Sequence, residues 1–360
     1  MDSQTIIESF RKLAIQIATP YSTGTGFMLP EHNLIITNEH VVRDNKQVVI
    51  QGYNFEKILT DVLFLDEKFD VAFLQIPESI NIDFSAQLSG REVEEGDEVI
   101  AIGHPFGLNY SATKGIVSNT LHKMHEIEYI QHDAALNPGN SGGPLISKHE
   151  EIIGINTFVV RNGHKIGFSL PSKYLRKTIA EYLEGDGKKA IRCEACEKII
   201  FETQNSSKYC EFCGARIRSI SSIEDYVAIG TCRTIEQIIA KLNYSVPLTR
   251  IGLSHWEVKR GSAYIHMSYH QKSGLITGDA HLCSLPEENI KQLYTYLLEQ
   301  NYHLDGLTLS VKGNHIILSL LIYDQYLNLE SGIDLFDHLF EEADRLDNIL
   351  VEEFGAQWLK

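Results

Sequence analysis

The stretch Gly139-Asn-Ser-Gly-Gly-Pro-Leu145 decides how this 360-residue chain is interpreted. A serine between glycines in a tight loop can present its hydroxyl beside backbone N–H groups, as a nucleophile with an oxyanion hole requires. Glycine also permits backbone angles that residues with a Cβ resist. We therefore predict that Ser141 is a nucleophile and that the N–H groups of Gly139 and Ser141 form the oxyanion hole. The alternative is a glycine-rich turn with an incidental serine.

A serine hydroxyl needs an adjacent base near neutral pH, and His40 in Thr37-Asn-Glu-His-Val-Val42 is our candidate for it. Asp70, at the start of an apolar run, is expected to orient His40 and to hold its tautomer. Chain order alone proves little, because unrelated proteases use several orders. The three local contexts together favour a His40, Asp70 and Ser141 triad. The competing residues are His32 and His104 for the base and Asp61 and Asp66 for the carboxylate.

The residues around these motifs, from about Leu13 to Leu183, form short apolar runs separated by Gly, Asn, Asp and Pro. Regularly spaced runs of this kind are typical of a β-sandwich or β-barrel. A helix is expected from Ser172 to Glu184, with Ser172 as its N-cap. The composition of the polar segment Glu184–Lys189 that follows indicates a linker. We place the first domain at residues 1–187.

This first domain resembles the HtrA/Deg branch of the trypsin-like serine proteases. The resemblance implies an all-β double barrel with the active site in the cleft between the barrels, acting on protein or peptide substrates. The matching motifs are Gly24-Thr-Gly-Phe27, Thr37–Val42, Asp70-Val-Ala-Phe-Leu74, Gly103-His-Pro-Phe-Gly-Leu108, Lys114-Gly-Ile-Val-Ser118, Gln131–Leu145 and Gly167-Phe-Ser-Leu-Pro-Ser172. No PDZ module is evident after this domain.

The same resemblance leads to expectations about substrate specificity and about control of activity. Digestive zymogens carry an acid just before the nucleophile that pairs with a freshly cut N-terminus, and here that position is Asn140. Activity is therefore expected to depend on the ordering of loops around residues 109–114, 133–138 and 158–165. No acid is evident at the base of the expected specificity pocket, so we predict a small or aliphatic residue before the scissile bond. The residues assigned to this pocket are Ala135, Asn156 and Phe158.

Four cysteines follow the first domain as two C-x-x-C pairs with thirteen residues between them. This spacing is strong evidence for a closed tetrahedral site, and we expect a structural zinc ion held by a zinc ribbon at residues 188–219. A closed site leaves no position for a reacting water, so no cofactor is expected for catalysis. A redox pair or buried core cysteines are the alternatives. The predicted ligands are Cys193, Cys196, Cys210 and Cys213.

Residues 220–360 have a mixed pattern that predicts an α+β sandwich in the order α-β-β-β-α-β-β-α. A capping box at Ser284-Leu-Pro-Glu287 is expected to open the middle helix, and Gly313-Asn314 to form a hairpin turn. The final helix, 333–354, carries an apolar face. Together with Ala343–Asp347 and Phe354-Gly-Ala-Gln-Trp358, this pattern is similar to type III secretion chaperones and YbjN-like proteins. The resemblance implies a domain that binds polypeptide or pairs with itself.

The net charge of −16, from 48 acidic and 32 basic residues, disfavours nucleic acid as a partner. The N-terminus has none of the features of a signal peptide and no apolar run could span a bilayer, so a cytoplasmic location without membrane contact is expected. The sequence thus predicts a cytosolic serine endopeptidase whose C-terminal domain recruits substrate or senses a regulatory partner. The sequence leaves open whether the chain forms a homo-oligomer. The alternatives are a non-enzymatic binding scaffold and a zinc-ribbon regulator associated with nucleic acid.

Overall fold

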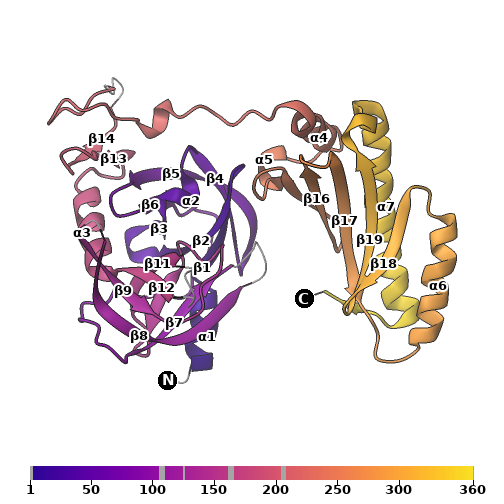
Figure 1. Cartoon of the computed structure of the whole chain (residues 1–360), viewed down its shortest axis with the longest axis horizontal. Helices are drawn as coiled ribbons and strands as arrows, with labels where there is room; N and C mark the ends of the chain where they lie inside the picture. The colour runs from indigo at the N-terminus through magenta and orange to yellow at the C-terminus, as the bar shows by residue number, and fades with distance from the viewer. Residues whose placement is uncertain (1–2, 105–109, 125, 161–165, 204–207, 360) are drawn as a thin grey trace. The chain divides into compact units, whose positions relative to one another are not determined.

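The computed structural model describes residues 3–104, 110–124, 126–160, 166–203 and 208–359 (Figure 1). Its internal contacts divide the chain into two compact units, Met1–Tyr226 and Val227–Lys360. The cysteine pairs therefore belong to the same unit as the predicted protease. Of the control loops expected from the sequence, parts of 109–114 and 158–165 lie outside the described residues, as does most of the motif at 103–108.

The first β-barrel of the N-terminal unit has the strand order β5-β4-β1-β2-β3-β6 and closes through pairing of β5 with β6. Its apolar side chains fill one core, to which helix α1 (Ser3–Arg11) adds Ile6 and Phe10. A short helix, α2, follows β3 and carries His40. The elements are β1 (Ala14–Ala18), β2 (Thr23–Leu29), η1 (Pro30–His32), β3 (Leu34–Thr37), α2 (Glu39–Val42), β4 (Gln47–Gly52), β5 (Phe55–Asp66) and β6 (Val71–Gln75).

A second closed barrel, in the order β10-β11-β12-β9-β8-β7, follows in the described part of the chain. The expected trypsin-like double β-barrel is therefore confirmed. Its strands are β7 (Glu98–Gly103), β8 (Ser111–Met124), β9 (Ile127–His132), β10 (Pro144–Ser147), β11 (Ile152–Val160) and β12 (Ile166–Pro171). Helix α3 (Ser172–Leu183) packs against β11 and β12.

The N-cap expected for α3 is wrong. Pro171 occupies the N-cap position without a side-chain hydrogen bond, and Ser172 is the first helical residue. The Ser172 hydroxyl donates to the carbonyl of Ser89 at 3.0 Å instead. The hydroxyl that the local pattern assigned to capping therefore donates to a residue distant in the sequence.

The segment after α3 extends the sheet of the first barrel. Strand β13 (Ala190–Arg192) pairs in parallel with β5 and antiparallel with β14 (Ile199–Phe201), and both precede the short helix η3 (Ile220–Ser222). This attachment places the cysteine pairs at the edge of the first barrel.

The C-terminal unit is a sheet of order β15-β16-β17-β19-β18 with β20 paired to β17. Helix α7 packs against β15, β16, β17 and β19, and it also contacts α4 and α6. Among the described helices, none combines the length and apolar character needed to cross a bilayer. The elements are α4 (Gly230–Lys241), α5 (Val246–Thr249), β15 (His255–Arg260), β16 (Ala263–His270), β17 (Leu275–Ser284), α6 (Ile290–His303), β18 (Leu307–Lys312), β19 (His315–Tyr323), η4 (Asp324–Tyr326), α7 (Leu329–Phe354) and β20 (Gln357–Trp358).

The capping box expected at the start of the middle helix is also wrong. Strand β17 runs to Ser284, and the N–H of Leu285 donates to the carbonyl of Asn314 at 2.8 Å. Helix α6 begins only at Ile290, after Asn289 with φ of 62°. Because Ser284 pairs with His315 of β19, it belongs to the sheet and does not cap a helix. The hairpin turn at 313–314 is present.

Candidate active site and cysteine cluster

The loop that carries Ser141 joins β9 to β10 and is held by its own backbone. The N–H of Asn140 donates to the carbonyl of Asn137 at 3.0 Å, and that of Gly143 to the carbonyl of Asn140 at 3.1 Å. Gly139 and Gly142 have φ of 102° and 86°, a region that residues with a Cβ rarely adopt. The glycines of this motif are therefore required by the backbone path.

The first barrel braces this loop from one side. The N–H of Thr25 donates to the carbonyl of Ser141 at 2.9 Å, and the Thr25 hydroxyl donates to the carbonyl of Gly139 at 2.6 Å. The same hydroxyl accepts the N–H of His104 at 2.8 Å. A Cβ added to Gly142 would lie 2.1 Å from the carbonyl oxygen of Thr25. This loop is therefore pressed against strand β2, with no room for a side chain at Gly142.

Strand β11 braces the loop through Asn156. The N–H of Gly142 donates to the carbonyl of Asn156, and the N–H of Asn156 donates to the carbonyl of Gly143, each at 2.8 Å. The Asn156 amide also donates to Pro144 and accepts the Ser169 hydroxyl at 3.0 Å. Asn156 is fully buried, so its side chain supports the loop from beneath.

A buried histidine completes this support. His132 Nε2 lies 3.0 Å from the Ser169 hydroxyl. Because that hydroxyl donates to Asn156, it accepts from His132, which fixes the proton on Nε2. Burial lowers the pKa of His132 to about 4, so the ring is neutral near pH 7. Thr25 and Ser169 belong to motifs named in the sequence analysis, but the motifs do not show which groups their hydroxyls bind.

His40 and Asp70 form a hydrogen-bonded pair. His40 Nδ1 lies 2.8 Å from Oδ2 of Asp70 and 3.0 Å from Oδ1, and the His40 backbone N–H donates to Oδ1 at 3.0 Å. Asp70 has φ of 52°, and its carbonyl accepts the Asn38 amide at 2.7 Å. The carboxylate can only accept, so it fixes the proton on Nδ1 and leaves Nε2 free to act as a base.

The pKa of His40 is raised by its surroundings. Burial lowers it, but the hydrogen bond and negative charge of Asp70, with a smaller contribution from Glu39, outweigh that effect. Arg43 lowers it slightly, since its guanidinium is already paired with Glu39 at 2.5 Å. Asp70 therefore stabilises the imidazolium that forms when His40 accepts a proton.

The competing residues make other contacts. His32 lies 3.3 Å from Glu31. His104 is buried, and burial lowers its pKa to about 4. Asp61 pairs with Lys189 at 3.4 Å, and Asp66 with Arg192 at 2.6 Å. The contact that distinguishes Asp70 from both carboxylates is its hydrogen bond to His40.

The loop that carries Ser141 approaches the segment that leads into α2. A Cβ on the neighbouring Gly142 would lie 3.0 Å from the N atom of Asn38, which immediately precedes α2. Within the described residues the Ser141 hydroxyl donates to the carbonyl of Thr157 at 3.2 Å, and no hydrogen bond joins it to His40. The N–H groups of Gly139 and Ser141 likewise have no protein acceptor there. The two predicted donors are therefore free to bind an anionic oxygen.

The three residues assigned to the specificity pocket differ in exposure. Ala135 is exposed, and its carbonyl accepts the Thr113 hydroxyl at 2.9 Å. Phe158 is half-buried, and its ring stacks on that of Phe168 with the ring centres 4.9 Å apart. Asn156 is buried in the support described above, which leaves it no surface for substrate. Direct contact with substrate stays a prediction for Ala135 and Phe158.

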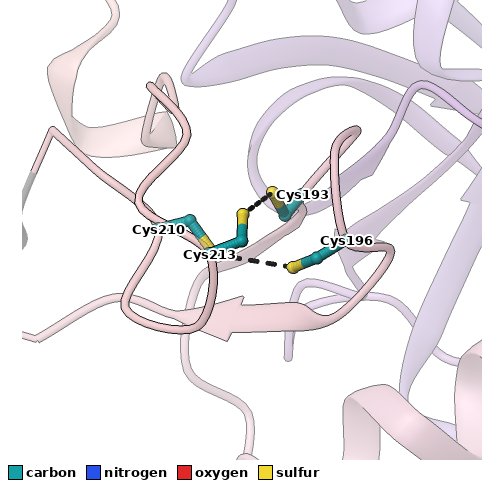
Figure 2. Close-up of side chains that lie close together, drawn as sticks. All are labelled: Cys193, Cys196, Cys210 and Cys213. Atoms are coloured by element: carbon teal, nitrogen blue, oxygen red, sulfur yellow. Dashed lines mark hydrogen bonds between the residues drawn. The ribbon is translucent and has the colours of Figure 1, made fainter.

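The four cysteines converge on one point (Figure 2). Their sulfur atoms all lie within 4.8 Å of one another, with Cys193 Sγ 3.7 Å from Cys213 Sγ and Cys196 Sγ 3.6 Å from Cys210 Sγ. A tetrahedral zinc–thiolate site with bonds of about 2.3 Å separates its sulfurs by about 3.8 Å. The donor set and its spacing therefore fit a zinc ion.

Both cysteine turns have the same backbone. The N–H of Glu197 donates to the carbonyl of Cys193 at 2.7 Å, as that of Gly214 does to Cys210 at 2.9 Å. Glu197 and Gly214 occupy equivalent positions with φ of 63° and 74°. This repeated turn presents two sulfurs from each pair to a shared centre, and it explains the glycine after the second pair.

Comparison with known proteins identifies the N-terminal unit. Residues 24–155 match the model of the trypsin-like peptidase domain. This part of the chain is similar to the trypsin-like peptidases of the HtrA/DegP type. It is 37% identical over 171 residues to a probable periplasmic serine endoprotease DegP-like of Chlamydia muridarum, covering 46% of this chain and 34% of that protein. It is 38% identical over 177 residues to human serine protease HTRA4, covering 46% and 36%.

Among solved structures, the serine endoprotease from Yersinia pestis matches with a TM-score of 0.46 and 27% identity, over 52% of this chain and 68% of that chain. The chain spans about a third of the length of the curated relatives named above.

The cytoplasmic location expected from the sequence is contradicted by these relatives. Those from Chlamydia muridarum and Chlamydia trachomatis are named probable periplasmic serine endoproteases. The expectation rested on reduced cysteines and on the composition of the first residues. Neither feature is tied to the residues of the candidate site, so neither could fix the compartment.

Proposed function

We propose that this chain is a serine endopeptidase in which Ser141 is the nucleophile, His40 the general base and Asp70 the residue that orients it. The observation that carries this proposal is the hydrogen-bonded His40–Asp70 pair, together with a Ser141 loop in which two N–H groups have no acceptor among the described residues. The family of the domain supports the same chemistry. Protein or peptide is the substrate class.

In the proposed reaction Ser141 Oγ attacks the scissile carbonyl carbon while His40 Nε2 takes the hydroxyl proton. The carbonyl electron pair moves onto oxygen, and the N–H groups of Gly139 and Ser141 stabilise that oxyanion. His40 then delivers its proton to the leaving amine as the C–N bond breaks. Water hydrolyses the resulting ester by the same steps, and Asp70 stays ionised throughout.

We infer that substrate binding also reorients Ser141. Its hydroxyl points to the carbonyl of Thr157, so it must turn toward His40 Nε2 before attack. The hydroxyl rotates about the Cα–Cβ bond between staggered positions, and this rotation is the change we infer. The small or aliphatic preference predicted from the sequence belongs to the pocket near Ala135 and Phe158.

Labelling with a fluorophosphonate probe tests the nucleophile. Wild type should be labelled and Ser141→Ala should not, because loss of such a nucleophile lowers turnover by on the order of a million-fold. Ser222→Ala is the matched control, since that exposed hydroxyl only donates to Ser219 at 2.7 Å. Equal labelling of wild type and Ser141→Ala would reject the assignment.

We also propose that the cysteine cluster holds a structural zinc ion. The four thiolates would supply all of its ligands, and the ion would join the two cysteine turns without taking part in catalysis. The sulfur separations described above support this assignment.

We propose in addition that residues 220–360 recognise a polypeptide, either substrate or regulator. The supporting observation is a row of exposed apolar side chains at four-residue spacing on α6: Ile290, Tyr294, Leu298 and Tyr302. Leu298→Glu should weaken cleavage of a protein substrate without changing that of a short peptide. Gln292→Glu, at an exposed position well around the same helix from this row, is the control. Equal effects of both variants would contradict this role.

A further inference from the structure

The cysteine cluster is attached to the strand that leads to Asp70. Strand β13 pairs in parallel with the end of β5, Ala190 with Phe64 and Ile191 with Leu65. The next residue of β13 is Arg192, directly before the first cysteine, and the next residue of β5 is Asp66, directly before the turn to Asp70. The pairing therefore sets Arg192 beside Asp66.

Arg192 and Asp66 form a buried ion pair. Arg192 Nε lies 2.6 Å from Asp66 Oδ2, with the two side chains 5% and 0% exposed. The guanidinium also donates to Glu181 at 2.8 Å and to the backbone carbonyl of Glu197 at 2.7 Å. One planar group thus joins β5, helix α3 and the first cysteine turn, which suits the fixed donor geometry of arginine.

The other oxygen of Asp66 holds the turn that carries the triad carboxylate. Asp66 Oδ1 accepts the N–H of Phe69 at 3.1 Å, and the Arg192 guanidinium lies 5.4 Å from the centre of the Phe69 ring. Lys68 in the same turn pairs with Glu197 at 2.5 Å. The turn ends at Asp70, whose φ of 52° is an uncommon backbone conformation that neighbours must maintain.

We propose that Arg192 is a positioning residue for the catalytic triad, which holds the 66–70 turn through Asp66 and so keeps the Asp70 carboxylate on His40. This inference rests on the proposed peptidase function. Because the carbonyl of Glu197 also binds Arg192, and the N–H of Glu197 closes the turn at Cys193, the order of the first cysteine turn is transmitted to the triad.

The test compares Arg192→Met with Lys189→Met in the full chain. Lys189 pairs with Asp61 of β5 at 3.4 Å, so its variant breaks an ion pair between the same two segments at the end distant from Asp70. Arg192→Met should lower kcat on the order of a hundredfold with little change in KM, as expected when a catalytic group is misplaced by about 1 Å. Lys189→Met should leave kcat near wild type.

A second readout separates positioning from general loss of stability. The pKa of His40, measured by NMR titration, should fall in Arg192→Met, because burial remains while the hydrogen bond and charge of Asp70 are weakened. Glu39 and Arg43, which also face His40, are unaltered in both variants. A wild-type His40 pKa in folded Arg192→Met would overturn the proposal, whatever the change in rate.

If Arg192→Met does not fold, Arg192→Lys tests the same positioning role. Lysine keeps a cation for Asp66 but cannot also reach Glu181 and Glu197, so kcat and the His40 pKa should both fall below wild type. Wild-type values of both would overturn the proposal. Absence of Ser141-dependent cleavage in wild type would instead reject the peptidase function, while the His40 titration would still test the contact with Asp70.

Discussion

Replacement of Thr25 by valine tests how the nucleophile loop is held. Valine has nearly the shape of threonine but lacks the hydroxyl, which donates to Gly139 at 2.6 Å and accepts from His104 at 2.8 Å. The backbone hydrogen bond from Thr25 to Ser141 would remain. The change therefore removes only the side-chain brace of the predicted oxyanion hole.

The magnitude follows from the groups left without partners. Each hydrogen bond contributes about 1 kcal/mol, and a buried group left unpaired costs roughly 1–3 kcal/mol. Thr25 is fully buried and satisfies two groups, so we expect a loss of about 2–4 kcal/mol in the free energy of unfolding. Complete loss of an oxyanion-hole donor lowers kcat by roughly a hundred- to a thousandfold. A shifted Gly139 should therefore lower kcat by about tenfold to a hundredfold.

Thr60→Val is the matched control. The Thr60 hydroxyl is buried in the same barrel and donates to the carbonyl of Gln75 at 2.6 Å, away from the nucleophile loop. It should lose about 1–2 kcal/mol of stability and keep its kcat. Urea unfolding and steady-state cleavage of a peptide measure both quantities. A wild-type kcat in Thr25→Val, or an equal fall in both variants, would refute the proposed brace.

Four further outcomes are expected. Because His40 must be neutral to accept a proton and its pKa is raised, kcat/KM should fall as pH drops through a value above 6.5, and a pH profile of Asp70→Asn should show this limb at lower pH. Cys210→Ser should reduce bound zinc, measured by atomic absorption, from one equivalent per chain, and an unchanged content would exclude the cluster as its site. Gly142→Ala should fail to produce active enzyme in a cleavage assay, since its Cβ would lie 2.1 Å from the Thr25 carbonyl oxygen. Asn328→Ala should destabilise α7 by about 1 kcal/mol in urea unfolding, because its side chain caps Ser331 at 3.0 Å, without changing cleavage of a short peptide.

Local patterns in the sequence predicted the residues of the candidate site. A glycine-flanked serine, a histidine after a short strand and an aspartate before another are local patterns, and the structure joins the histidine and the aspartate by a hydrogen bond. The cysteine spacing likewise predicted that four sulfurs would meet. Such motifs can be recognised because each one requires particular residue types at fixed short separations, which a linear sequence preserves.

The groups that support these residues depend on the folded arrangement of the strands. Thr25 reaches Gly139 across 114 positions of sequence, and Arg192 reaches Asp66 across 126. The wrong caps at Ser172 and Ser284 have the same cause, since a distant acceptor or strand took the groups that a local pattern assigned. A hydroxyl or guanidinium has several possible partners of similar strength, so its contact depends on which strands the fold brings together, and no local pattern records that choice.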